Sequence, residues 1–200
     1  VGTKMLSNIK NKIATFFLLF IICFVILAEN IFAKPENKIF SGGRHMVLLT
    51  AHIVEKERAI LGAYYFGVFN HTKSAGELKT QITLPQETIH FEAEQGIENK
   101  DIYLGNDGAI EIKKTFPPGM TLVGIGFKIR PNLFTQNKIN FVIKESITEL
   151  SVATPIASGL SLSSKQLTPG LSEMLSTGEY QGLIGKNIKP ETVDGKAIIP

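Results

Sequence analysis

Cysteine is almost absent from this chain of 200 residues, and its scarcity excludes several kinds of chemistry. The single cysteine, Cys23, lies within an apolar N-terminal run that we expect to be removed. The mature chain would then have no disulfide, no thiolate nucleophile and no cysteine ligand for zinc. A lipid anchor at Cys23 is not expected, because residues 20–22 are large where lipoprotein processing favours small ones.

The N-terminal run has the order of parts that is typical of a secretory signal peptide. Three lysines come first, at Lys4, Lys10 and Lys12. The uncharged run Ile13–Leu27 follows, and Ala33 supplies a small residue for cleavage. We therefore expect residues 1–33 to be a cleaved signal peptide and the protein to be extracytoplasmic, in the periplasm, the cell envelope or the medium. The alternative is an uncleaved anchor helix, since a bilayer core needs about 20 apolar residues and Ile13–Phe32 comes close.

The net positive charge is also small once the N-terminal segment is set aside. The whole chain has 21 Lys and Arg against 18 Asp and Glu, a net charge of +3. Without residues 1–33 it would carry 18 basic and 17 acidic side chains, a net charge of +1. A nearly balanced chain without a run of lysine or arginine lacks the clustered positive charge that nucleic acids require. We expect no nucleic-acid partner.

Metal ligands are few and scattered. The four histidines are His45, His52, His71 and His90, and none lies within five residues of another. A copper site built from His45, Met46 and His52 is conceivable, because thioether and imidazole ligands suit copper. The alternative is that His52 ends a strand, His71 lies in a loop and His90 faces solvent. We expect no metal site and no cofactor.

Carboxylates do not form a recognisable catalytic set. Aspartate occurs three times, at Asp101, Asp107 and Asp194. The segment around Asp107 lacks the spaced carboxylates of a calcium loop and is typical of a turn. Glu92 and Glu94 share one phase of an expected strand and could form a carboxylate pair, but two carboxylates on a polar face are more often simply solvated. We expect no catalytic residues and no enzymatic activity.

Apolar and polar residues alternate from Leu78 to Ile129, the stretch around which the chain is organised. The apolar phases are Leu78, Ile82 and Leu84; Ile89, Phe91 and Ala93; Ile110 and Ile112; and Val123, Ile125, Phe127 and Ile129. Asp107-Gly108 predicts a tight turn between the strands Ile102–Leu104 and Ile110–Ile112, and Pro118-Gly119 predicts another. A period of two, without any run of helical length, predicts an all-β fold of antiparallel strands packed as a sandwich.

Further strands are expected on both sides of this stretch. Met46–His52 and Ala59–Phe69 predict a hairpin after a polar lead-in at Lys34–Arg44, and Asn70–Gly76 predicts a loop. This loop opens with Asn70-His71-Thr72, which fits the glycosylation sequon. The aromatic cluster of Ala59–Phe69 comprises Tyr64, Tyr65, Phe66 and Phe69. Alternation predicts that half of it is core and that the other half is an exposed pair suited to sugar or protein contact.

The composition loosens after Arg130, which predicts two units in the mature chain. We place a β-sandwich domain at residues 38–136 and a second, partial β-rich unit at residues 137–200, with one helical turn opened by Thr168-Pro169. The sequence stops at Ala197–Pro200 within an expected strand. The second unit is then either cut short or a half-sheet completed by a partner, for which Tyr180–Pro200 would supply the free edge.

The strand and turn motifs between Arg58 and Arg130 carry a resemblance. The motifs are Tyr64–Asn70, Ile82–Pro85, Phe91–Ala93, Asp107-Gly108, Phe116–Gly119 and Phe127–Ile129. Their succession resembles the exported immunoglobulin-like β-sandwich modules of bacterial cell-envelope proteins, which are similar to carboxypeptidase-regulatory-like and fibronectin-like domains. The resemblance implies an immunoglobulin-like sandwich and transfers no functional residue.

Two function classes follow. The first is a non-catalytic cell-envelope module, structural or adhesive, that contacts another protein or a second copy of itself through a sheet edge. The second is an extracytoplasmic module that binds a carbohydrate or a metal ion. A membrane contact is expected only through residues 1–33 if they stay uncleaved.

Overall fold

The computed structural model describes residues 39–54, 57–85, 88–105, 109–130, 137–143, 146–175, 178–189 and 191–198. The expected signal segment, residues 1–33, lies outside this range. Within the described parts of the chain, no helix has the length and apolar character needed to cross a membrane.

The described residues form strands and two short 3-10 helices, which confirms the all-β prediction. In chain order the elements are β1 Ile39–Val54, β2 Glu57–Asn70, β3 Gly76–Ile82, β4 Thr88–Gln95, η1 Asn99–Asp101, β5 Ile102–Leu104, β6 Ile110–Phe116, β7 Gly119–Ile129, β8 Asn137–Ile143, β9 Ile147–Pro155, η2 Ile156–Ser158, β10 Ser161–Ser164, β11 Thr168–Leu175, β12 Gly178–Ile188 and β13 Glu191–Ile198.

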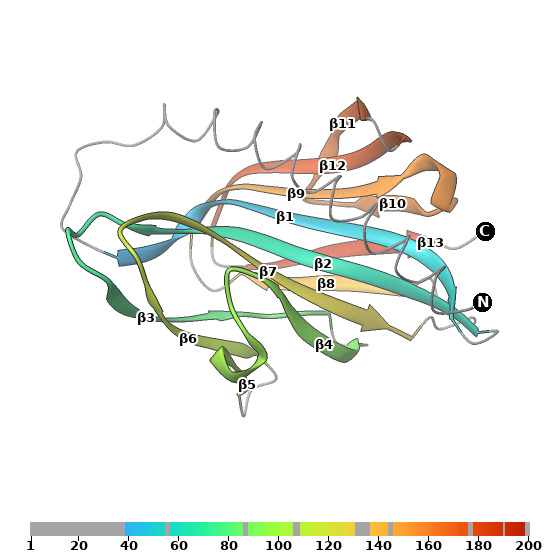
Figure 1. The fold of residues 1–200 in the computed structure, drawn as a ribbon. Coiled ribbons are helices and arrows are strands. Elements are labelled where there is room, and N and C mark those ends of the chain that lie inside the picture. Colours follow the sequence, from blue (N-terminus) through green and yellow to red (C-terminus); the bar gives the residue numbers. More distant parts are fainter. Residues whose placement is uncertain are drawn as a thin grey trace.

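The strands make three sheets (Figure 1). The largest has the order β11-β12-β9-β1-β2-β7-β4, and the two smaller ones have the orders β10-β13-β8 and β3-β6-β5. The strand pairs of the described residues are antiparallel except for β1 with β9, which run parallel over Arg44–Leu48 and Glu149–Ala153. The predicted β1–β2 hairpin is present, and β1 extends to Ile39 through part of the expected lead-in.

The main core lies on one face of the large sheet. Alternate residues of the central strands point into it, including Val47 of β1, Phe66 of β2 and Ile125 of β7. The sheet β3-β6-β5 covers this face with Ile82, Ile112 and other apolar residues, so the fold is a sandwich of packed β-layers. The apolar phase predicted for Val123–Ile129 is confirmed, because all four of its side chains are buried.

The opposite face of the large sheet holds a second, smaller apolar cluster of Met46, Ala63 and Tyr65. Strand β2 therefore buries both of its phases, and Tyr64, Tyr65, Phe66 and Phe69 are all buried. The predicted exposed aromatic pair is wrong. A strand that is buried on both sides does not show the alternation from which exposure was predicted.

Three other local predictions differ from the structure. Ile89 was expected in the core, but its side chain is 49% exposed, because the register of β4 against β7 shifts between Thr88 and His90. The helical turn expected at Thr168-Pro169 is instead the start of strand β11. The free edge expected within Tyr180–Pro200 is also wrong for the strands there: β12 lies between β11 and β9, and β13 lies between β10 and β8.

The large sheet takes strands from both sides of the boundary that the sequence predicts near residue 137. Strands β1, β2, β4 and β7 come from the first expected unit, and β9, β11 and β12 come from the second. Leu150 and Val152 of β9 belong to the same core cluster as Val47 of β1. That residues 38–136 form a domain of their own stays a prediction.

Candidate functional site

Two edge strands lie on one side of the sandwich, joined by a short connection. Strand β4 is an edge of the large sheet, and β5 is an edge of the sheet β3-β6-β5. Residues 96–101, which include η1, link the end of β4 to the start of β5. Figure 1 shows these two strands at the lower side of the molecule. An unpaired strand edge offers backbone groups to another chain, so each edge is a candidate contact site.

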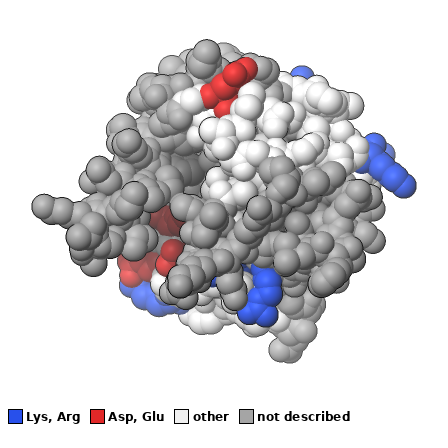
Figure 2. All heavy atoms as spheres, turned by 90° about the vertical axis from the view of Figure 1, so that its right-hand side faces the viewer, with Lys and Arg blue, Asp and Glu red and all other residues white. Residues whose placement is uncertain are grey.

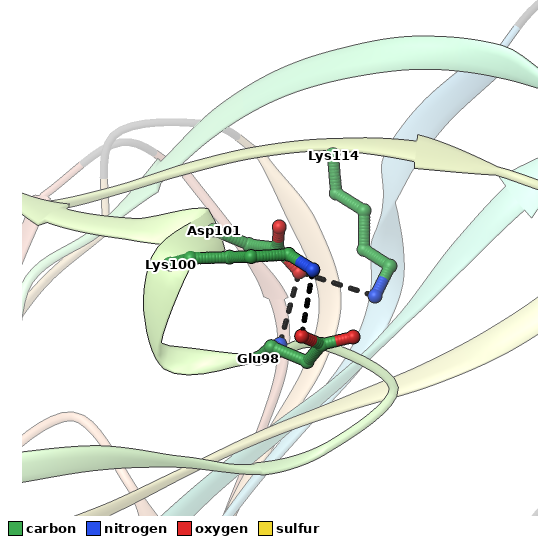
Figure 3. Close-up of polar contacts among 4 residues, drawn as sticks. All are labelled: Glu98, Lys100, Asp101 and Lys114. Carbon is green, nitrogen blue, oxygen red and sulfur yellow. Dashed lines mark hydrogen bonds and ion pairs between the residues drawn. The ribbon is translucent and has the colours of Figure 1, made fainter.

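Polar contacts hold the connection between the two edges in place. The Asp101 carboxylate accepts hydrogen bonds from the Glu98 backbone N–H at 2.9 Å and from Lys114 Nζ at 3.1 Å, and Lys100 pairs with Glu98 at 2.8 Å (Figure 3). Burial opposes ionisation of Asp101, but the two hydrogen bonds and the positive charges of Lys114 and Lys100 together outweigh it and hold the pKa of this carboxyl below its usual value. This carboxylate is therefore a structural anchor that fixes the start of β5.

The β4 edge is protected against strand addition. Its register shifts between Thr88 and His90 and again between Ala93 and Gln95. The Ala93 backbone N–H donates to the Asn99 side-chain oxygen at 2.7 Å. Bulges, a capped N–H and charged side chains all disfavour pairing with another strand.

Glu92 and Glu94 lie on one face of β4, beside Gly126 of β7, as the alternation predicts. The Tyr65 hydroxyl donates to Glu94 Oε2 at 2.5 Å, and Glu92 lies opposite Gly126 in the register. A side chain at Gly126 would overlap the Glu94 carboxylate, so glycine makes room for the contact. Burial of the carboxylate raises the pKa of Glu94, although the side chain as a whole is exposed; the Tyr65 bond opposes this shift and Glu92 adds to it. The Tyr65–Glu94 bond fastens β4 to the sheet.

The β5 edge, Ile102–Leu104, has none of these protections among the described residues. Its three residues are uncharged, and the side chains of Tyr103 and Leu104 are 56% and 65% exposed. Leu104 lies opposite Ile110, on the phase that faces the core, yet its side chain is left exposed. Together with Ile89 of β4, these are three of the five large apolar side chains that are exposed in the described residues.

Polar side chains surround Tyr103 on the outer face of the small sheet. Tyr103 lies opposite Glu111, which accepts a hydrogen bond from Gln81 at 2.9 Å and pairs with Lys79 at 2.9 Å. Figure 2 shows the described Lys, Arg, Asp and Glu side chains of one face of the molecule in small separate groups. Tyr103 and Leu104 point to opposite faces of β5, so the edge strand exposes apolar surface on each of its sides.

The conceivable copper site is not assembled. His45 pairs with Phe66 and faces the main core, whereas Met46 pairs with Tyr65 and faces the opposite side of the sheet. Adjacent residues of a strand point to opposite faces, so these two side chains cannot bind one ion. His90 is exposed, as predicted, and His71 lies in the loop after β2. No group of three His, Cys, Asp or Glu suited to a metal ion occurs in the described residues.

Asn70, the sequon residue, is a structural residue. It is 2% exposed, and its amide nitrogen donates to the backbone oxygens of Ser74 at 3.0 Å and Phe116 at 2.9 Å. Its oxygen accepts from the backbone N–H of Thr72 at 2.9 Å and from the Thr72 hydroxyl at 2.6 Å. These contacts close the loop and tie β2 to the end of β6.

Neither the Tyr103–Leu104 edge nor the Tyr65–Glu94 bond was singled out from the sequence. Ile102–Leu104 was recognised as a strand before an Asp-Gly turn, but its place at an edge depends on which strand pairs with β6. The Tyr65–Glu94 contact depends on a bulge in β4, and the regular alternation of Ile89–Glu94 gives no signal for it.

Comparison with known proteins supports the fold. No family model and no curated protein matches this chain. A crystal structure of a proposed nutrient-binding protein from Legionella pneumophila is similar over 79% of this chain and 67% of its own, with 8% identity and a TM-score of 0.50. A proposed protease from Parabacteroides distasonis covers 81% of this chain and 40% of its own, with 12% identity and a TM-score of 0.37. The first likeness, together with the packed sheets, places the chain among the β-sandwich-like proteins.

Proposed function

We propose that this protein is an exported, non-catalytic β-sandwich that acts by contact with another protein through the β5 edge. The observation that carries the proposal is the exposure of two adjacent large apolar side chains, Tyr103 and Leu104, on an uncharged edge strand. Natural edge strands are usually covered, charged or bulged, as β4 is. An edge without such protection, in a chain that protects its neighbour, is the best candidate for a binding surface.

The partner that fits this edge is an extended segment of another protein. A strand added beside β5 would enlarge the sheet β3-β6-β5 and would pair with main-chain groups of the edge. Its side chains would alternate between the outer face, where Tyr103 stands, and the core phase, where Leu104 stands. A segment with two adjacent apolar residues, one on each face of the added strand, would therefore cover both.

Export is the second part of the proposal. It is supported by the basic, apolar and small-residue order of residues 4–33. Cleavage near Ala33 would release the chain to the periplasm, the envelope or the medium. The resemblance of residues 58–130 to immunoglobulin-like envelope modules is consistent with such a location, and we propose that this part of the chain is a module of that kind.

The contact is tested with the double change Tyr103→Lys and Leu104→Lys. Charges at an edge strand oppose pairing, so protein isolated from the producing cells should lose a co-purifying partner or, in sedimentation, its self-association. The matched control is Ile156→Lys, which changes an apolar side chain, 42% exposed, in η2. The proposal would be contradicted if both variants kept the partner or the self-association equally, or lost it equally, while their unfolding midpoints stayed unchanged.

A second candidate is an extracytoplasmic module that binds a carbohydrate or a metal ion. It is favoured only by the description of the Legionella protein as a proposed nutrient-binding protein. This candidate predicts a rise in the thermal unfolding midpoint with a sugar or a divalent cation, whereas the contact proposal predicts no such rise.

A further inference from the structure

A buried histidine lies where the two parts of the large sheet join. His45 is 8% exposed and opposes Leu150 in the parallel β1–β9 ladder, which has five residue pairs. The antiparallel β1–β2 ladder, by contrast, has fourteen. This short ladder, Arg44–Leu48 with Glu149–Ala153, is called the seam below. It is the backbone connection of β9, β11 and β12 to the rest of the sheet.

The groups around the His45 ring are aromatic or apolar. The ring stacks on Phe66 with centroids 5.5 Å apart, and its edge contact with Tyr64 has centroids 5.6 Å apart. Nδ1 shares a 2.7 Å hydrogen bond with the Tyr64 hydroxyl. Nε2 is buried and has no hydrogen-bond partner among the described residues.

Among the residues that the structure describes, burial alone shifts the titration of this ring, with no charged side chain beside it. Strand β2 contributes Tyr64, and burial raises the pKa of that phenol, so it stays neutral. Strand β9 contributes the apolar side chain of Leu150. The Arg44–Glu149 ion pair lies on the next rung of the seam, on the opposite phase from His45.

Burial therefore governs how the ring titrates. It lowers the pKa of His45 from 6.5 to about 4. A proton on the folded ring would create a buried charge, and the cationic ring carries hydrogen on both nitrogens, with no acceptor for Nε2–H among the described residues. When the seam opens and the ring meets water, its pKa returns toward the ordinary value, so acid favours the open form.

Two features weaken the seam. Parallel pairing is slightly weaker per residue than antiparallel pairing. The polar side-chain contacts across the seam are long: Arg44 Nε lies 3.7 Å from Glu149 Oε1, and the Ser151 hydroxyl lies 3.5 Å from the His45 oxygen.

From this geometry we propose that His45 makes the seam an acid-sensitive joint, and that protonation of its ring releases β9, β11 and β12 from β1 while the β1–β2–β7 strands stay paired. The device would let an exported protein change shape in an acidic setting. It is independent of the β5 contact, because β5 and the seam belong to different sheets.

Hydrogen exchange followed by mass spectrometry on the full chain tests the joint. Labelling at pH 7.5 and pH 4.5, with times corrected for intrinsic exchange rates, reports opening strand by strand. In the wild type we expect the opening equilibrium of residues 44–48 and 147–155 to rise on the order of 50- to 100-fold at pH 4.5, as follows from a histidine that is protonated only when open. Strands β2 and β7 should keep their protection.

Two variants separate this mechanism from general acid effects. His45→Gln removes the titrating group and should abolish the pH-dependent rise, whereas His90→Gln, at an exposed histidine of β4, should leave it unchanged. If His45→Gln does not fold, His45→Phe replaces it and keeps a ring against Phe66. An equal rise in wild type and His45 variant, uniform loss of protection over all strands, or a seam that stays protected at pH 4.5 would each overturn the proposal.

Discussion

At the scale of single residues, the core depends on pairs in which one strand leaves room for a side chain of the next. Phe127 lies opposite Gly62, and a side chain at Gly62 would overlap the Phe127 ring. In the same way Tyr65 lies over Gly124 of β7. Large aromatic rings therefore cover glycines of the neighbouring strand on both faces of the large sheet.

Truncation of Phe127 should be strongly destabilising. Because its ring is buried in the main core, Phe127→Ala should lower the free energy of unfolding by about 3–5 kcal/mol, measured by denaturant titration of the full chain. Lys113→Ala is the control: this exposed side chain makes a single long ion pair with Glu77 at 3.8 Å, so the change should stay within about 0.5 kcal/mol. Equal effects would show that the assigned core phase is wrong.

Loss of the Tyr65 hydroxyl should loosen the β4 edge. Tyr65→Phe removes the hydrogen bond to Glu94 and keeps the ring, so we expect a loss of roughly 1–3 kcal/mol in unfolding free energy. Hydrogen exchange should show the loss of protection first in β4. Tyr103→Phe removes an exposed hydroxyl and serves as the control; a similar loss in both variants would argue against a specific role for the Tyr65–Glu94 bond.

At the scale of strands and loops, the asparagine of the glycosylation sequon is a buried structural residue. Asn70 makes four hydrogen bonds that join the loop after β2 to the end of β6. Asn70→Ala would leave the buried backbone oxygen of Phe116 without this donor, so we expect the variant to lose about 2–4 kcal/mol in unfolding free energy. Because the Asn70 amide is buried, we also expect the wild type to carry no glycan at this position.

Ser74→Ala is the matched control for Asn70→Ala. The Asn70 amide donates to the Ser74 backbone oxygen, which the substitution leaves in place, and the Ser74 side chain is exposed. Its unfolding free energy should stay within about 0.5 kcal/mol of the wild type. A glycan on Asn70, or equal losses in the two variants, would mean that this loop is not closed by Asn70.

The strands themselves could be predicted because a period of two is a direct consequence of burying one face. The phase of Val123–Ile129 follows from it, and the Asp107-Gly108 turn signal indicates the pairing of Ile102–Leu104 with the strand that begins at Ile110. Ile89 was misplaced because a bulge shifts the phase without changing the composition. Strand β2 was misjudged because both of its faces are covered. The contact between Tyr65 and Glu94, 29 residues apart, depends on both of these features.

At the scale of the whole molecule, the parallel pairing of β1 with β9 makes the expected two units share one sheet and one core. No local sequence pattern predicts such a pairing, since it depends on residues more than a hundred positions apart. A sheet shared in this way is expected to unfold as a single cooperative unit near neutral pH.

A fragment of residues 34–136 should therefore be less stable than the full chain. Without β9 it lacks Leu150 and Val152, which pack in the same core cluster as Val47. We expect its denaturant midpoint to fall well below that of residues 34–200, or its unfolding to lose cooperativity. Identical midpoints and identical sharpness would instead support independent folding of residues 38–136.

Contact through the β5 edge can be observed directly by site-specific photo-crosslinking in the producing cells. A photoreactive phenylalanine analogue replaces Tyr103 in one variant and His90, on the protected β4 edge, in another; both positions are exposed. Covalent attachment of a second protein, or of a second copy of this chain, is expected from position 103 and not from position 90. Attachment from position 90 alone, from both positions equally, or from neither would contradict a protein contact at the β5 edge.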